Sequence, residues 1–220
     1  MWENLSLLVH NPTKVSTRVQ VLWADPPSTI GCLCIAFLAI QALKDPSGVK
    51  DQIENLLPFL LNSIKSGTDD SRENSLILLY AFMPILNDKD AHFLVENKVF
   101  NALVRFFMCS KPEMRMMCAG ICSAIYTGRY FAQIAFANEK GPAQLIKLIQ
   151  WSSGNPENLS ALLVYLEGLL VSENDQRSSD LCVVSQEFMA WDVLRDLKQK
   201  NNDPVIDEQL GHLITILMHS

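Results

Sequence analysis

The chain has 220 residues, of which 49% are hydrophobic and 19% are charged, and its formal net charge is −6. This composition supplies enough apolar surface for a folded core and excludes an intrinsically disordered chain. Lys and Arg are scattered singly along an acidic sequence. We therefore expect no binding to nucleic acid or to anionic membrane surfaces, because both need clustered cations.

The first predicted element lies within residues 15–43 and ends in the apolar run IGCLCIAFLAIQAL at residues 30–43. A membrane-spanning helix needs about 20 apolar residues, and this run is shorter and bounded by Pro26 and Pro46. Its small residues suit a helix that packs closely against neighbours. The sequence therefore predicts a buried helix of a folded protein and no membrane insertion.

The next segment predicts a pair of helices. Residues 53–67 form the shorter helix, and Gly67 provides a C-terminal stop. Residues 69–86 form the longer helix, opened by Asp and Ser side chains that can cap its first N–H groups. Asp69, Asp70 and Glu73 are interpreted as favourable charges at the positive end of a helix, rather than as acid–base catalysts.

The same pattern recurs twice in the middle of the chain. Residues 99–128 and 141–173 share the same order of features. Each begins with an apolar helix, continues with a polar break that contains Pro-Glu, at Pro112 or Pro156, and ends with a longer apolar helix. Pro is tolerated in the first turn of a helix, where its missing N–H would have no partner. Short helices are predicted between the copies, such as residues 90–98 and 129–140. Each unit thus consists of a short helix, a second helix and a long helix.

The last copy comprises residues 190–200 and 203–218, with Asp203 as the cap before Pro204. No hairpin signal or sustained alternation indicates a strand. We expect an all-α chain that folds as a single repeat domain over residues 1–220. Its approximate units are 1–45, 46–88, 89–128, 129–174 and 175–220.

Residues 141–171, GPAQLIKLIQWSSGNPENLSALLVYLEGLLV, resemble an armadillo repeat. A Gly opens the second helix, a Leu-rich stretch follows, and a polar break precedes a third helix that ends in an apolar run. The resemblance extends over most of residues 15–218, and HEAT repeats, with two helices per unit, are a close alternative. It implies a right-handed α-α superhelix of about five repeats. It also implies a non-catalytic scaffold or adaptor that binds other proteins through its inner face.

Peptide-binding members of this family carry a ladder of Asn, and in some a ladder of Trp, on successive third helices. The matching positions here hold small or apolar residues and one His, so the amide ladder that grips an extended peptide backbone is missing. An amphipathic helix satisfies its own backbone, so we expect either a helical partner segment or another part of an assembly that covers the groove. The Gly168→Trp substitution should then fill the groove without reducing helical content. The predicted inner-face positions are Cys34, Leu38, Ile77, Ala81, Gly120, Ala124, Val164, Gly168, His212 and Ile216.

A second candidate for partner binding is the start of the helix that follows Pro112. Met114, Arg115 and Met116 stand together there, and unbranched methionines adapt to varied partners. The alternative is that Met117 fills the core while Met114 and Met116 belong to an exposed helix start.

No catalytic, cofactor-binding or metal-binding constellation is recognised. His212 and His219 share a face of the last helix, but a solvated terminal helix explains them better than a metal. The six cysteines lack the neighbouring ligands of a zinc site, and they predict reduced thiols in a cytoplasmic protein. We expect no enzyme and no cofactor. The alternatives to an adaptor are a structural subunit of a larger assembly and an armadillo-type nucleotide-exchange factor that assists a chaperone.

Overall fold

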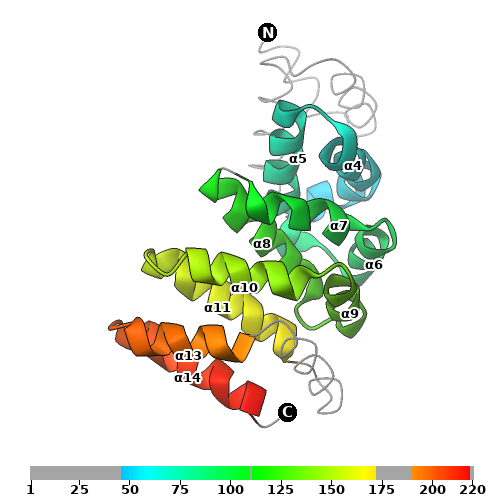
Figure 1. Ribbon diagram of the computed structural model, residues 1–220. Coiled ribbons are helices and arrows are strands. Elements are labelled where there is room, and N and C mark those ends of the chain that lie inside the picture. The colour runs from blue at the N-terminus through cyan, green and yellow to red at the C-terminus, as the bar shows by residue number, and fades with distance from the viewer. Residues whose placement is uncertain (1–45, 110, 172–189, 219–220) are drawn as a thin grey trace. The chain divides into compact units, whose positions relative to one another are not determined.

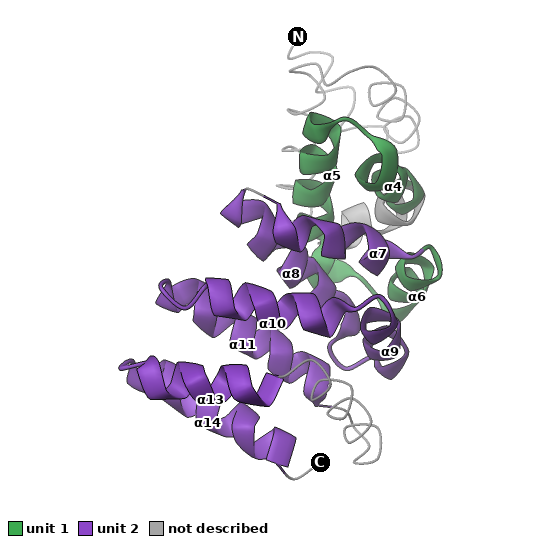
Figure 2. Cartoon of the chain, viewed as in Figure 1, with its two compact units in different colours: residues 1–97 green, residues 98–220 purple. Residues whose placement is uncertain are grey.

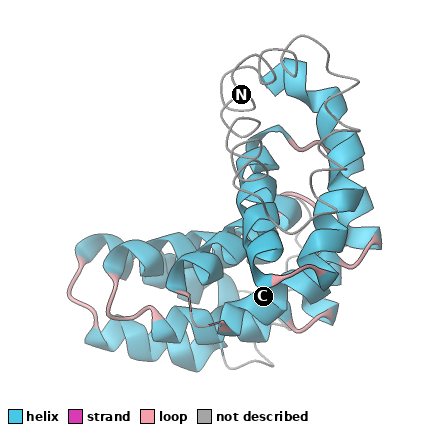
Figure 3. Cartoon of the chain, turned by 90° about the horizontal axis from the view of Figure 1, so that it is seen from above, coloured by secondary structure: helices cyan, strands magenta, loops and turns pink. Residues whose placement is uncertain are grey.

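The computed structural model describes residues 46–109, 111–171 and 190–218, and every regular element within these ranges is a helix (Figure 3). None of the described helices is both long enough and apolar enough to cross a membrane. The apolar run at residues 30–43 lies outside the described residues. The chain divides into two compact units, residues 1–97 and residues 98–220, which are coloured separately in Figure 2.

Unit 1 contains α4 (Pro46–Ser66), α5 (Asp69–Phe82), the 3-10 turn η1 (Met83–Ile85) and α6 (Asp88–Glu96) (Figure 1). Helix α4 packs against both α5 and α6. Within residues 56–66 of α4, four leucines and one isoleucine are almost inaccessible to solvent. These buried residues are Leu56, Leu57, Leu60, Leu61 and Ile64.

Two predicted helix bounds in unit 1 are wrong. Helix α4 begins at Pro46 rather than at residue 53, so with 21 residues it is longer than α5, which has 14. A Pro at the first helical position starts a helix as readily as it bounds one. Helix α5 ends at Phe82 instead of residue 86, because Pro84 lacks an N–H and its ring clashes with the preceding turn of an α-helix. The chain continues through η1.

The N-cap of α5 also differs from the expectation. Thr68 is the capping residue, and its hydroxyl accepts a hydrogen bond from the Ser71 N–H at 3.3 Å. Asp69 and Asp70 occupy the first turn, where their charges favour the positive end of the helix dipole. The predicted stop is confirmed, since α4 ends immediately before Gly67, whose N–H donates to Ser63 O at 2.8 Å.

Unit 2 contains eight described elements. In chain order they are α7 (Val99–Val104), η2 (Arg105–Met108), α8 (Pro112–Tyr126), α9 (Tyr130–Asn138), α10 (Gly141–Trp151), α11 (Pro156–Leu170), α13 (Ala190–Lys200) and α14 (Pro204–Met218).

The helices of unit 2 stack as successive pairs. Helix α10 packs on α11 and α13 packs on α14, and Figure 1 shows the two pairs lying one beside the other. Helix α11 contacts both α8 and α14, while α10 contacts both η2 and α13. One series therefore consists of α8, α11 and α14, which we call the third helices. The other consists of η2 with α7, α10 and α13, which we call the second helices.

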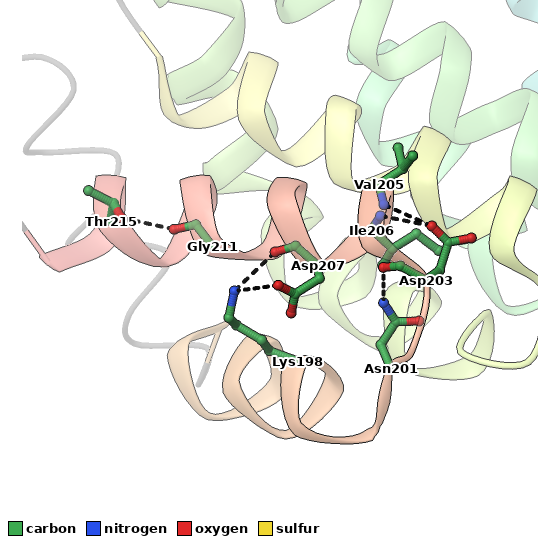
Figure 4. Close-up of polar contacts among 8 residues, drawn as sticks. All are labelled: Lys198, Asn201, Asp203, Val205, Ile206, Asp207, Gly211 and Thr215. Carbon is green, nitrogen blue, oxygen red and sulfur yellow. Dashed lines mark hydrogen bonds and ion pairs between the residues drawn. The ribbon is translucent and has the colours of Figure 1, made fainter.

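Each third helix begins with Pro at its first position, as predicted. Asn155 caps α11 by accepting the Asn158 N–H at 3.0 Å. The predicted cap Asp203 is confirmed, because its carboxylate accepts the N–H groups of Val205 at 2.9 Å and Ile206 at 3.3 Å (Figure 4). These bonds satisfy backbone donors that have no partner within the helix.

Lys198 joins the last two helices. Its ammonium group donates to Asp207 O at 3.0 Å and to the Asp207 carboxylate at 3.2 Å, which fixes the C-terminal half of α13 beside the start of α14 (Figure 4). A Cβ on Gly211 would lie 3.0 Å from this ammonium group. The small residue thus allows the Lys198 side chain to lie close to α14.

The core of unit 2 is centred on Phe136 of α9. Its ring lies 5.0 Å from the Tyr126 ring and 5.2 Å from the Phe100 ring, measured between centroids. A Cβ on Gly141 would collide with the same phenyl ring, which explains in physical terms why a Gly opens α10. Aromatic contacts of this kind combine a large buried area with a preferred ring geometry.

Buried hydrogen bonds connect α8 and α9 to α11. The Tyr126 hydroxyl donates to Tyr165 O at 2.6 Å. The fully buried Gln133 amide donates to Gly168 O and Val171 O, each at 3.0 Å, and so satisfies carbonyls at the C-terminal end of α11. These bonds fix the register of α11, the central third helix.

Candidate partner-binding face

The third helices present one continuous side that carries the predicted site in unit 2. Neighbouring helices contact one another along this side. Thr127 at the end of α8 faces Gly168 of α11, and Glu167 of α11 contacts His212 of α14. We call the exposed side of α8, α11 and α14 the third-helix face.

The exposure of the predicted positions varies along this face. Val164 is half exposed, Ala124 and His212 are exposed, and Gly168 and Ile216 are half-buried. Gly120 differs, because it is buried within α8 and offers little surface to a partner. The predicted positions therefore contribute small and apolar residues and one imidazole to this face.

The other predicted positions lie outside unit 2. Ile77, which is 40% exposed, and the half-buried Ala81 lie on α5 in unit 1. Tyr80, which is 47% exposed, lies beside them on the same helix. Cys34 and Leu38 lie outside the described residues.

A polar contact between two side chains crosses the third-helix face. His212 Nε2 lies 3.2 Å from Glu167 Oε1, and both side chains remain substantially exposed to solvent. An exposed pair of this kind contributes little to stability. Glu167 was not among the predicted site residues, although its position directly before Gly168 places it close to the expected ladder. No cluster of three or more metal-ligating side chains occurs in the described part of the chain.

Gly168 lies at a close approach between two third helices. A Cβ at this position would be 2.5 Å from Thr127 Oγ1 and 3.4 Å from Thr127 Cγ2. Any side chain at this position would therefore displace the Thr127 side chain, which makes Gly168→Trp unsuitable as a probe of binding alone. Val164 is the better position, because half of its side chain already faces solvent.

The residues of the second predicted candidate site, 114–116, differ in their exposure to solvent. Met114 is only 8% exposed and belongs to the core, whereas Met116 and Met117 are half-buried. Met114 is therefore not at an exposed helix start, and the core position belongs to Met114 more than to Met117. The side chain of Arg115 extends across the turn before α8, where its Nε–H donates to Cys109 O at 2.6 Å.

Burial makes the thiols of α8 poorly suited to act as nucleophiles or metal ligands. Desolvation raises the pKa of Cys118 and of Cys122, and each is raised further by a neighbouring thiol. Neutral thiols are poor nucleophiles and poor metal ligands. Cys109, Cys118 and Cys122 form no disulfide with any described residue.

Comparison with solved structures identifies the fold. The "armadillo repeats only" protein from Plasmodium falciparum superposes with a TM-score of 0.73 at 20% sequence identity, covering 88% of this chain and 82% of that one. A designed armadillo repeat protein gives a TM-score of 0.75 at 14% identity, with 98% and 86% coverage. The chain has the armadillo-like helical-repeat fold. The predicted all-α superhelix is thereby confirmed.

Another armadillo structure was determined with a ligand. It is a designed armadillo repeat protein in complex with the peptide (KR)4, with a TM-score of 0.58, 11% identity, and coverage of 91% of this chain and 98% of that one. No protein-family model and no curated protein matches the sequence. At sequence identities this low, the likeness to armadillo structures establishes the fold alone. The function has to be argued from the residues of the candidate site.

Proposed function

We propose that this armadillo-like chain is a non-catalytic scaffold or adaptor that binds another protein through its third-helix face. The observation that carries the proposal is Val164, which stays half exposed on a Leu-rich helix between two packed neighbours. Covering it removes apolar surface from water, which stabilises a complex by about 25 cal/mol per Å² before the costs of association. Solenoid repeats commonly use such a continuous face for partners.

The partner that fits this face is helical. The positions where an amide ladder would hold an extended chain are Ala124, Gly168 and Ile216, none of which carries a polar side chain. An extended peptide buried there would leave backbone groups unpaired at a cost of about 1–3 kcal/mol each. A helix satisfies its own N–H and C=O groups and needs only an apolar surface. The peptide-bound designed armadillo structure supports protein ligands for the fold in general.

The test introduces one carboxylate on the third-helix face and one elsewhere. Val164→Glu places a charge on the proposed contact, whereas Gln199→Glu adds the same charge to an exposed position of the second helix α13. Proteins co-purified with each variant and with the wild type are quantified by mass spectrometry. We expect wild type and Gln199→Glu to recover the same partner, and Val164→Glu to lose it by about tenfold or more.

Circular dichroism must show equal helical content for all three proteins, since both substitutions are at solvent-accessible helix positions. Equal recovery by Val164→Glu and wild type would contradict the proposed face. The stoichiometry of the recovered partner distinguishes the two roles left open by the sequence. A permanent one-to-one complex indicates a structural subunit, and a substoichiometric partner indicates an adaptor.

A further inference from the structure

The neighbouring third helices α11 and α14 carry charge of one sign. Neither helix contains Lys or Arg, although the chain has 18 such residues. Their acids are Glu157 and Glu167 on α11, and Asp207 and Glu208 on α14. Because α11 packs directly against α14, these carboxylates belong to one part of unit 2 (Figure 1).

On α14 an acid shares its side of the helix with an exposed valine. Val205, Glu208 and His212 follow one another at spacings of three and four residues, which places them on one side of an α-helix. Val205 is 60% exposed, and Glu208 and His212 are exposed as well. This side of α14 therefore offers both apolar surface and a carboxylate to a partner.

Helix α11 repeats the combination. Val164 is 50% exposed, and Glu167 lies three residues later on the same side. The contact of 3.2 Å between Glu167 Oε1 and His212 Nε2 brings this side of α11 beside the corresponding side of α14. Val164, Glu167, Val205, Glu208 and His212 together form what we call the α11–α14 strip.

The carboxylates of the α11–α14 strip are available to a partner. The Glu208 carboxylate makes no hydrogen bond or ion pair with any described residue, and the Glu167 carboxylate contacts His212 alone within the described part of the chain. Lys198 of α13 does reach α14, but its ammonium group is bonded to Asp207 (Figure 4). Consecutive residues of a helix are about 100° apart, so Asp207 points away from the side that carries Glu208.

The cation at the end of α8 is also engaged. Arg129 donates from its guanidinium group to Ala124 O at 3.0 Å and to Ile125 O at 3.3 Å. These bonds hold Arg129 at carbonyls of the last turn of α8. The α11–α14 strip thus keeps two carboxylates beside two exposed valines.

This combination decides the chemistry of the partner. A segment that covers Val164 also removes part of Glu167 from water, and burial of a carboxylate is unfavourable unless a cation pairs with it. An acidic segment would in addition be repelled by Glu167 and Glu208. A segment with both apolar and basic side chains covers the valines and neutralises the carboxylates at the same time.

We propose that the α11–α14 strip binds an amphipathic helix whose apolar stripe is flanked by Lys or Arg. The proposal rests on the proposed function and specifies the partner of that same face. The apolar stripe covers Val164 and Val205, and the flanking cations face Glu167 and Glu208. Opposite charges at the margin of an interface speed association and select the partner, while the apolar contacts hold the helix in place.

The probe for this proposal is a fluorescein-labelled peptide of about 18 residues, long enough to form a helix. It consists of Ala, Leu and Lys, with Leu at every third or fourth position and Lys on both sides of that stripe. Fluorescence anisotropy at about 0.1 M salt should show saturable binding, with a Kd that rises as salt is added. A shuffled peptide of the same composition has no apolar stripe, and its Kd should be about tenfold or more higher. An equal Kd for both peptides would overturn the proposal in favour of a general attraction for polycations.

A matched pair of charge reversals locates the site. Glu208→Lys should raise the Kd of the helical peptide about fivefold or more, whereas Asp192→Lys should leave it within about twofold. Asp192 is exposed on the second helix α13, so both variants change the net charge of the chain equally. Circular dichroism must show the same helical content for both. Equal increases in Kd would overturn the proposal, because they would reflect net charge alone.

Two further measurements separate the apolar from the charged contribution. Val205→Ser removes apolar surface without adding charge and should raise the Kd about threefold. Replacing every Lys of the peptide by Glu should abolish binding up to about 1 mM. Binding of this acidic peptide with the Kd of the basic one would overturn the proposal, since the strip would then recognise apolar side chains alone.

Failure of this proposal can be distinguished from failure of the proposed function. Glu208→Lys is included in the co-purification experiment beside Val164→Glu, and both should lose the partner. Loss by Val164→Glu with full recovery by Glu208→Lys would retain the third-helix face and overturn the basic helix as its ligand. Full recovery by both variants would overturn the face itself.

Discussion

The two buried thiols of α8 make stability depend on pH. Cys118 and Cys122 are almost inaccessible to solvent, and desolvation raises the pKa of both above the ordinary thiol value of 9.0. Below pH 9 both thiols hold their protons in the folded and unfolded chain alike. Above pH 9 the unfolded chain releases these protons and the folded chain keeps them, so the unfolded state gains free energy of ionisation.

We therefore predict that the free energy of unfolding falls as pH rises above 9. Each thiol should contribute a loss of about 1 kcal/mol by pH 10, and the raised pKa of buried Tyr126 acts in the same direction above pH 10. Urea unfolding at a series of pH values measures the slope. Cys122→Ala should be less stable at neutral pH yet lose less stability between pH 8 and 10. An unchanged slope in this variant would contradict the assignment.

Single residues also show which features of the candidate site could be predicted from the sequence and which could not. A spacing argument placed Ala124 and Val164 at exposed positions of successive long helices, because helical periodicity is visible in the sequence. It could not foresee the cation–π contact of Arg115 with Trp151, whose residues come from two different helices. It also missed the burial of Gly120, since the packing partner of a glycine leaves no local signal.

At the scale of the helix, two equivalent turns share an unusual backbone. Lys98 precedes α7 with φ of 56°, and Lys140 precedes α10 with φ of 59°. This left-handed region costs a residue with a side chain about 1–2 kcal/mol relative to its usual conformation, and glycine avoids the cost. The repeat therefore places the same backbone turn before its second helix in both copies, with Lys at each.

A matched pair of substitutions tests this interpretation. Lys140→Gly should leave stability unchanged or raise it by up to about 1 kcal/mol, because relief of the left-handed strain opposes the greater freedom of glycine in the unfolded chain. Lys147→Gly, in the middle of the same helix, should lower stability by about 1 kcal/mol. Urea unfolding measures both variants. Equal destabilisation by the two would show that the turn stores no strain.

The bounds of several helices could be predicted because their ends carry local chemistry. Asp203 with Pro204 marks the start of α14, and Pro156 marks that of α11. The extent of α4 and α5 could not be predicted as well. Pro46 was taken as a boundary when it begins a helix, and the effect of Pro84 on the last turn of α5 was overlooked.

For the whole molecule, repetition in the sequence predicted the fold more securely than any single segment did. Two copies with a Pro-Glu break and a longer apolar helix indicated stacked units, and the armadillo-like fold agrees. The partner could not be predicted in the same way. The proposed face carries no side-chain motif that names a partner, and its residues come together only when the third helices lie side by side after folding.

Photo-crosslinking tests the central claim, that a partner binds the third-helix face, most directly. Benzoylphenylalanine is introduced at Val164 on α11 in one variant and at Gln199 on α13 in another, both at exposed positions. Each variant is irradiated in the presence of the partner recovered by the wild type. We predict covalent capture of that partner from position 164 and none from position 199. Capture from position 199 with none from position 164 would contradict the claim.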